Sequence, residues 1–275
     1  MDDYLRAALL GMVQALTEFL PVSSSGHLIL APRLLGDEAS SLTFDVGLHV
    51  GTAVAVVGYF WRDWVRIIFE GVRDLSVHGR HVGRWTPRAQ LGLWLALASV
   101  PAAGAGLLLD ATVEEHLREP WIVGAMLIAF GLVIWVLDAW GGTLGRIEQM
   151  TAGRALIVGV AQVLALVPGV SRSGVTIAAA RGLGFDRGSA ARFSFLLSAP
   201  IVLGAGGLKL VDALSGDEPV EWGPLVAGAV VASVVGAFVI RALLAFLASH
   251  TLRPFVWYRI ALGLAVLGAS ATGTL

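Results

Sequence analysis

Two segments of the chain repeat one another. Residues 11–36, GMVQALTEFLPVSSSGHLILAPRLLG, align without a gap with residues 159–184, GVAQVLALVPGVSRSGVTIAAARGLG, at an offset of 148 positions. Twelve of the 26 aligned positions are identical, where composition alone would give about two or three. Each copy has an apolar arm, a polar tip and a second apolar arm. The repeat predicts a chain of two related halves and identifies the corresponding segments.

Apolar sequence surrounds both copies. The chain is 56% hydrophobic and 14% charged, whereas soluble domains carry about 25% charged residues. A membrane-spanning helix needs roughly 20 apolar residues, and six stretches are long enough or nearly so: 44–60, 91–109, 121–137, 193–211, 223–248 and 255–272. We therefore predict an all-α polytopic membrane protein. A net charge of −1 argues against a nucleic-acid partner.

The repeated segments differ from the six predicted spans because a tip with Ser, Gly and Pro interrupts each one. The arms are short, at 4–20 and 28–36 in the first copy and 154–167 and 174–185 in the second. Irregular backbone at membrane depth is tolerated only where it lines an enclosed cavity. The pattern therefore predicts two re-entrant helical hairpins.

The charges of the connections give an orientation. Residues 61–90 hold six arginines against three acids, which places that loop in the cytoplasm, while the acidic segments 110–119 and 212–221 lie outside. Hairpin one then enters from outside and hairpin two from inside. We predict one integral membrane domain, 1–275, made of inverted repeats at about 1–140 and 152–275. In such repeats the broken elements meet near mid-membrane.

The two tips carry different chemistry. Glu18, Ser24 and His27 in the first copy align with Leu166, Arg172 and Val175 in the second, and Thr176 aligns with Leu28. One tip therefore supplies a carboxylate and an imidazole, and the other supplies a guanidinium and a hydroxyl. An ionised group inside a membrane segment is usually functional. The alternative for Arg172 is a purely structural ion pair with Glu18.

A divalent cation is predicted at the first tip. Gln14 and Glu18 stand four residues apart and present both side chains on one helix face. A carboxylate and an amide oxygen suit Mg²⁺ or Ca²⁺. The alternative is a Gln–Glu contact that only joins helices.

An anion site is predicted at the second tip. Arg172 opens a half-helix whose backbone N–H groups point at the tip, and this combination binds phosphate. The tip residues expected to bind substrate are Ser23, Ser25, Gly26, Ser171, Ser173, Gly174 and Thr176. With His27 as base, acid or nucleophile, the set indicates phosphoryl transfer on a lipid phosphate. A lipid-phosphate transporter or flippase is the alternative, since inverted repeats with re-entrant hairpins are typical of transporters.

Two motifs resemble a known family. QALTEFLPVSSSGH (14–27) is similar to the (E/Q)xxxE and SSSGH elements of bacterial undecaprenyl-diphosphate phosphatases, the bacitracin-resistance proteins. PGVSRSGVT (168–176) is similar to their PGxSRSxxT motif. The similarity extends to ARFSFLLSAPIVLGA (191–205) and PFVWYRIALG (254–263). A different lipid phosphatase class with a second motif His is set aside, because Ala178 stands at that position.

The resemblance implies hydrolysis of undecaprenyl diphosphate to undecaprenyl phosphate, which recycles the lipid carrier for peptidoglycan synthesis. It implies a divalent cation and an inner-membrane protein whose site opens to the periplasmic side. Glu18 and Gln14 fall on the acidic motif, with Gln where many members have Glu. His27 and Ser24 fall on SSSGH, and either could be the nucleophile. The sequence is compatible with a homodimer but does not define the oligomeric state.

Overall fold

The computed structural model describes residues 2–34, 42–143, 145–215 and 221–273. Within these ranges the chain is helical, and its one β-bridge joins Gly145 to Phe185. Besides the short 3-10 helices η1 (Val82–Arg84), η2 (Ile147–Gln149) and η3 (Leu164–Leu166), the elements are α1 (Asp3–Phe19), α2 (Ser24–Leu34), α3 (Leu42–Tyr59), α4 (Trp61–His78), α5 (Pro87–His116), α6 (Pro120–Trp140), α7 (Ala152–Val163), α8 (Arg172–Gly182), α9 (Arg187–Ser215), α10 (Trp222–Leu247) and α11 (Arg253–Ala271).

Five helices in the described residues are long and apolar enough to cross a membrane, and they lie in α5, α6, α9, α10 and α11. A sixth candidate is a bent pair, Phe44–Tyr59 with Trp61–His78, whose axes differ by 70°. The polytopic all-α class predicted from the sequence is confirmed. The predicted span 44–60 qualifies only together with the helix that follows it.

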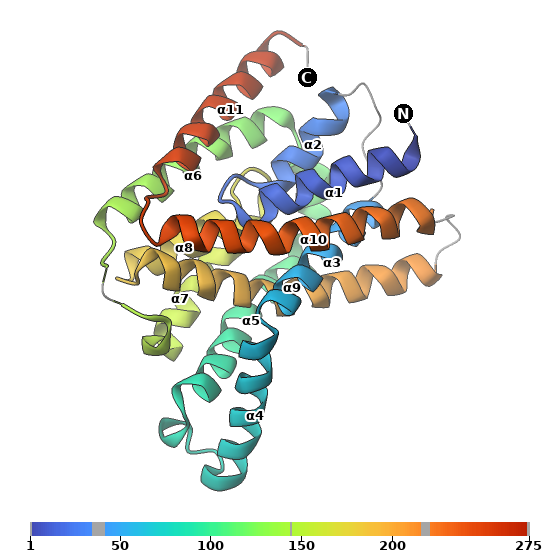
Figure 1. Ribbon diagram of the computed structural model, residues 1–275. Helices are drawn as coiled ribbons and strands as arrows, with labels where there is room; N and C mark the ends of the chain where they lie inside the picture. Colours follow the sequence, from blue (N-terminus) through green and yellow to red (C-terminus); the bar gives the residue numbers. More distant parts are fainter. Residues whose placement is uncertain (1, 35–41, 144, 216–220, 274–275) are drawn as a thin grey trace.

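The segment 61–90, predicted as a loop, contains a helix instead. α4 occupies Trp61–His78 and packs against the first turns of α5. Its many charges suggested a connection, but apolar residues recur within them at helical spacing, as at Trp61, Val65 and Ile68. Figure 1 shows α4 extending away from the helix bundle beside α5.

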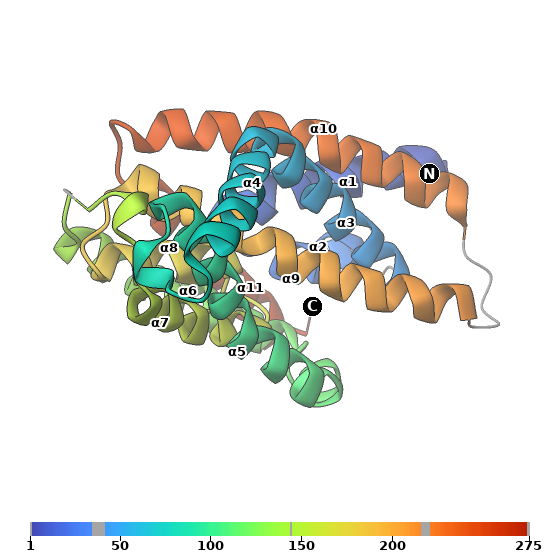
Figure 2. The same ribbon diagram turned by 90° about the horizontal axis from the view of Figure 1, so that it is seen from below.

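The repeat appears in the helix boundaries. α2 begins at Ser24, and α8 begins 148 residues later, at Arg172. In both copies the preceding arm packs on a helix of the other half: α1 lies along α10, and α7 lies along α5. Figures 1 and 2 show α1 and α10 side by side from two directions. The two halves are therefore interleaved rather than separate.

Glycines allow the helices of the two halves to pack in close contact. A Cβ on Gly11 in α1 would overlap the backbone carbonyl of Gly228 in α10, and a Cβ on Gly159 in α7 would overlap that of Ala98 in α5. Gly11 and Gly159 are equivalent positions of the repeat. Small residues let membrane helices approach at the backbone, so the same device holds the first arm of each hairpin.

A buried ion-pair cluster fixes the opposite end of hairpin two. Asp138 of α6 accepts hydrogen bonds from Arg181 Nε at 2.9 Å and from Arg187 Nε at 2.7 Å. Arg181 is 1% exposed and also donates to the backbone carbonyls of Asp138, Gly141 and Phe185. A buried charge is tolerated when it is paired and hydrogen-bonded. This cluster anchors α8 at its carboxyl end and leaves its amino end for the site.

Candidate functional site

The two hairpin tips share one unusual turn. Ser23 has φ 78° and Ser171 has φ 74°, the two positive values among described non-glycine residues. Each serine Oγ accepts a hydrogen bond from a glycine N–H three residues on, Gly26 at 3.4 Å and Gly174 at 3.1 Å. Non-glycine residues with positive φ are uncommon and concentrate at functional sites. Both α2 and α8 therefore start from a constrained, serine-capped turn.

The tips touch one another. Ser173 Oγ of hairpin two donates to the backbone carbonyl of Leu20 in hairpin one, at 3.1 Å. The buried guanidinium of Arg259, on α11, donates to Pro21 O at 3.3 Å and to Gly169 O at 2.8 Å. One cation thus binds carbonyls of both tips. The amino ends of α2 and α8 are thereby held next to each other.

Glu18 lies at the centre of the site. The side chain is 6% exposed, and its Oε1 pairs with Arg172 Nη2. Its Oε2 accepts from Ser24 Oγ at 2.5 Å and from Gln14 Nε2 at 3.0 Å. The structure therefore brings together four of the predicted residues, two from helix α1 and one from the first turn of each half-helix.

Arg172 uses only one of its guanidinium nitrogens to bind Glu18. Its Nη2 makes the ion pair, while Nε and Nη1 have no hydrogen-bond partner among the described residues. The side chain keeps 18% exposure. A guanidinium has five N–H donors in a planar fork that matches phosphate oxygens. Arg172 can therefore hold Glu18 and donate to an anion at once.

The other polar residues of the tips stabilise the two turns through hydrogen bonds. Ser25 Oγ lies 3.3 Å from Ser23 Oγ, and Ser173 Oγ lies 3.3 Å from Ser171 Oγ. Thr176 is buried, and its hydroxyl donates to the carbonyl of Arg172 at 2.8 Å. Its oxygen also lies 2.7 Å from Ser194 Oγ. In this conformation Thr176 stabilises the first turn of α8, and a direct substrate contact stays a prediction.

His27 faces away from Glu18 and toward α11. Its Nδ1 lies 2.7 Å from the carbonyl of Ser23, and its Nε2 lies 2.7 Å from the hydroxyl of Tyr258. A carbonyl can only accept, so Nδ1 carries a proton, and in the neutral imidazole Nε2 then accepts from the tyrosine O–H. The two rings are stacked, with centroids 5.7 Å apart and planes at 7°.

Three site residues escaped the sequence analysis: His49, Tyr258 and Arg259. His49 on α3 places Nε2 3.6 Å from Glu18 Oε2, while its Nδ1 lies 2.8 Å from Asp45 O. All three lie inside predicted spans, 44–60 and 255–272, where they were counted as part of apolar runs. Polar side chains within spans are themselves a functional signal, and that signal would have found His49 and Arg259.

The donor set was tested against a divalent cation. Gln14 Oε1 is buried and has no hydrogen-bond partner, so an oxygen next to Glu18 lacks a donor or cation. No group of three or more His, Cys, Asp or Glu suited to a metal occurs in the described residues. Mg²⁺ commonly uses one or two protein carboxylates, with substrate phosphates and water as its other ligands. The residues present fit a cation of that kind.

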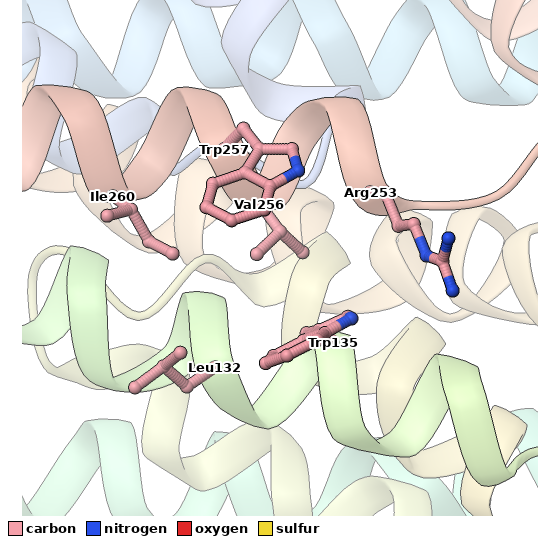
Figure 3. A pocket seen from close by; sticks show the side chains of 6 residues that line it. All are labelled: Leu132, Trp135, Arg253, Val256, Trp257 and Ile260. Atoms are coloured by element: carbon pink, nitrogen blue, oxygen red, sulfur yellow. The ribbon is translucent and has the colours of Figure 1, made fainter.

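A groove on the outer side of α6 and α11 is separate from this site. It is lined by Leu132, Trp135, Arg253, Val256, Trp257 and Ile260. Figure 3 shows the two tryptophans and the aliphatic side chains between the helices, with Arg253 at one end. None of the hairpin-tip residues lines this groove. The candidate active site is the cluster of the tips, because it brings Glu18, Ser24 and Arg172 into contact.

Comparison with known proteins identifies the family. Residues 7–265 match the family described as Bacitracin resistance protein BacA. The chain belongs to this family. It is 48% identical to an undecaprenyl-diphosphatase of Trichlorobacter lovleyi over 99% of both chains. It is 46% identical to one of Geobacter sulfurreducens, over 96% of this chain and 97% of the relative. It is 42% identical to one of a Nocardioides species over the full chain and 99% of the relative.

Proposed function

We propose that this protein hydrolyses undecaprenyl diphosphate to undecaprenyl phosphate and inorganic phosphate. The name of its relatives supports this reaction, because identity of 42–48% extends over nearly the whole chain. The proposal places the protein in the bacterial inner membrane with its site open to the periplasmic side. There it would regenerate the lipid carrier for peptidoglycan synthesis.

The observation that carries the proposal is the contact of Ser24, Glu18 and Arg172. The Ser24 hydroxyl donates to a carboxylate at 2.5 Å, beside a guanidinium with unused donors. A hydroxyl bonded to a base is an activated nucleophile, and a fixed cation next to it stabilises the charge that develops on a phosphoryl group. Phosphoryl transfer requires these two functions together.

The proposed reaction has two steps. Ser24 Oγ attacks the terminal phosphorus, its proton passes to Glu18 Oε2, and the bond to the bridging oxygen breaks to release undecaprenyl phosphate. Glu18 passes this proton to the departing undecaprenyl phosphate and is again a free carboxylate. It then takes a proton from the water that attacks the phosphoserine and returns it to Ser24 Oγ as inorganic phosphate leaves, which restores both residues. Arg172 and the free N–H groups at the amino end of α8 hold the phosphoryl oxygens. Glu18 and Gln14 would hold a divalent cation, which supplies charge neutralisation of the diphosphate.

His27 is the competing nucleophile. Its Nε2 lone pair accepts the Tyr258 hydroxyl at 2.7 Å, so attack by the imidazole requires that this bond break first. Ser24 needs no such rearrangement, because it already contacts Glu18. The geometry therefore favours Ser24, with His27 as a neighbouring group that orients hairpin one.

Trapping a phospho-enzyme tests the assignment. Protein in detergent receives a stoichiometric amount of substrate labelled at the terminal phosphorus, and aliquots are quenched in acid or alkali before peptide mapping. Phosphoserine survives acid and phosphohistidine survives alkali, so the two quenches separate the candidates. We expect an acid-stable label on Ser24 that is lost in Ser24→Ala and retained in the exposed control Ser249→Ala. An alkali-stable label on His27 would overturn the assignment to Ser24.

The same preparation tests the transporter alternative. Hydrolysis proceeds in detergent, where no second leaflet exists, whereas a pure transporter releases no phosphate there. Absence of phosphate release by wild-type protein, with Mg²⁺ or Ca²⁺ supplied, would refute the proposed reaction itself. Addition of chelator followed by either metal tests whether the reaction requires a divalent cation.

Light scattering of the same sample measures whether the protein is a homodimer.

A further inference from the structure

α4 has an exposed apolar stripe that the bundle does not cover. Its members are 53–69% exposed, and they are Trp61, Val65, Ile68, Phe69, Val72 and Leu75. Successive residues of an α-helix are rotated by about 100°, which places all six within one sector of the helix. Ile67 and Asp74 are buried on the side that faces α5. The helix therefore has a packed side and an unpacked apolar side.

Arginines line one edge of the apolar stripe. Arg62, Arg66 and Arg73 are exposed and fall in one narrow sector, between the stripe and the side that packs on α5. Arg62 lies over the ring of Trp61 at 5.3 Å, and neither it nor Arg66 pairs with a carboxylate among the described residues. Arg73 is bonded to Asp74. A stripe of apolar residues flanked by cations is typical of helices that lie in a membrane interface.

The direction of α4 agrees with that location. It is bent by 70° from α3, so a membrane-crossing α3 leaves α4 running close to the plane of the bilayer. α4 cannot itself cross, because its 18 residues include Arg62, Asp63, Arg66, Glu70, Arg73 and Asp74. Its carboxylates Glu70 and Asp74 bond to Thr86 before α5, which fixes α4 against that helix. The apolar stripe is thereby held outward on a rigid two-helix arm.

We propose that α4 is an interfacial helix that binds anionic phospholipids of the leaflet it touches. The apolar stripe inserts among the acyl chains, and Arg62 and Arg66 bind headgroup phosphates, as arginines at a membrane surface do. The excess of arginine in residues 61–90 assigns this surface to the cytoplasmic leaflet. This proposal does not depend on the reaction at the hairpin tips.

Spin labels measure the depth of the stripe. The chain has no cysteine, so a single introduced cysteine carries the only label. Val72→Cys and Val77→Cys form a matched pair, because the valines are 66% and 67% exposed but lie on different faces of α4. In nanodiscs of phosphatidylethanolamine and phosphatidylglycerol, we expect oxygen to reach the Val72 label and an aqueous nickel chelate to reach the Val77 label. Equal access of the nickel chelate to both labels would overturn the proposal.

The Val72 label also tests another occupant. Spin–spin coupling between two Val72 labels in one nanodisc would show that a second copy covers the stripe, and this outcome too would overturn the lipid assignment. We expect no coupling.

Lipid selection tests the arginines. In mixed nanodiscs, the enrichment of labelled phosphatidylglycerol around wild-type protein should fall about five-fold for each interfacial arginine lost. Arg62→Gln with Arg66→Gln removes two charges from α4, and Arg80→Gln with Arg84→Gln removes two from the exposed segment after it. We expect the enrichment of phosphatidylglycerol to fall clearly more for Arg62→Gln with Arg66→Gln than for Arg80→Gln with Arg84→Gln. Equal losses would show that net charge alone, and not the edge of α4, attracts the lipid.

Discussion

The two hairpin tips share a serine-capped turn and differ in chemistry. Ser23 and Ser171 adopt the same positive φ and cap Gly26 and Gly174 in the same way. The residue that follows each serine differs, Ser24 in one tip and Arg172 in the other. A duplicated scaffold therefore positions two first turns against each other, and divergence at single positions supplies a hydroxyl on one side and a cation on the other. The shared turn determines the geometry of the site, and the residues that differ, Ser24 and Arg172, determine its reactivity.

The strongest test of this difference removes the cation. Arg172→Gln should lower phosphate release about 10²–10³-fold, the loss typical when a charge-stabilising donor is deleted. Arg241→Gln, an exposed arginine on α10, is the matched control and should retain wild-type activity. Initial rates in detergent, with both variants monodisperse, measure the effect. Near wild-type activity of Arg172→Gln would leave the Glu18 pair a purely structural contact.

The next test separates the tips physically. Arg259→Met removes the donor shared by Pro21, Gly169 and Val170. Each buried carbonyl left unpaired costs about 1–3 kcal/mol, so we expect a lower Tm together with lost activity. Thermal unfolding followed by tryptophan fluorescence measures the change. An unaltered Tm would show that the tips hold each other without Arg259.

The close helix contacts of the two arms should be equally sensitive. Gly11→Ala and Gly159→Ala each place a methyl against a backbone carbonyl, and overpacking of this kind costs about 1–3 kcal/mol. Gly153→Ala is the control, because nothing lies within 4 Å of its added Cβ on the same helix α7. That variant should stay within about 0.5 kcal/mol of the wild type. A loss confined to one arm would mean that the two contacts are not equivalent.

The smallest expected effect concerns His27. Tyr258→Phe removes the O–H on His27 Nε2 and retains the ring stack. If Ser24 is the nucleophile, activity should fall only a few-fold, because the hydroxyl acts on orientation alone. Steady-state rates measured over a range of pH detect any change. A loss as large as that of Arg172→Gln would instead place His27 at the phosphorus.

The sequence predicted the parts of the fold that depend on local pattern. Hydropathy identified five of the six predicted spans as helices long enough to cross a membrane, and the repeat located both tips and placed Glu18, Ser24 and Arg172 among the site residues. The sequence analysis did not predict α4. In a window of membrane-span length, the charged residues of this segment conceal the helical spacing of its apolar residues. Tyr258 and Arg259 reach the tips only through the packing of α11 on α6. A charge within the predicted span 255–272 marks Arg259 as functional, but no local pattern shows that it contacts the tips.

The buried guanidinium of Arg259 also sets a charge balance. At the tips Glu18 contributes −1, Arg172 contributes +1 and Arg259 contributes +1, so these side chains leave an excess of one positive charge, to which the proposed divalent cation would add two more. In a weakly polar interior this excess favours the ligand with more negative charge. A diphosphate carries more charge than either monophosphate formed from it. The same electrostatic imbalance that attracts the substrate therefore weakens the hold on undecaprenyl phosphate once the anhydride is cleaved, and on inorganic phosphate once the phosphoserine is hydrolysed.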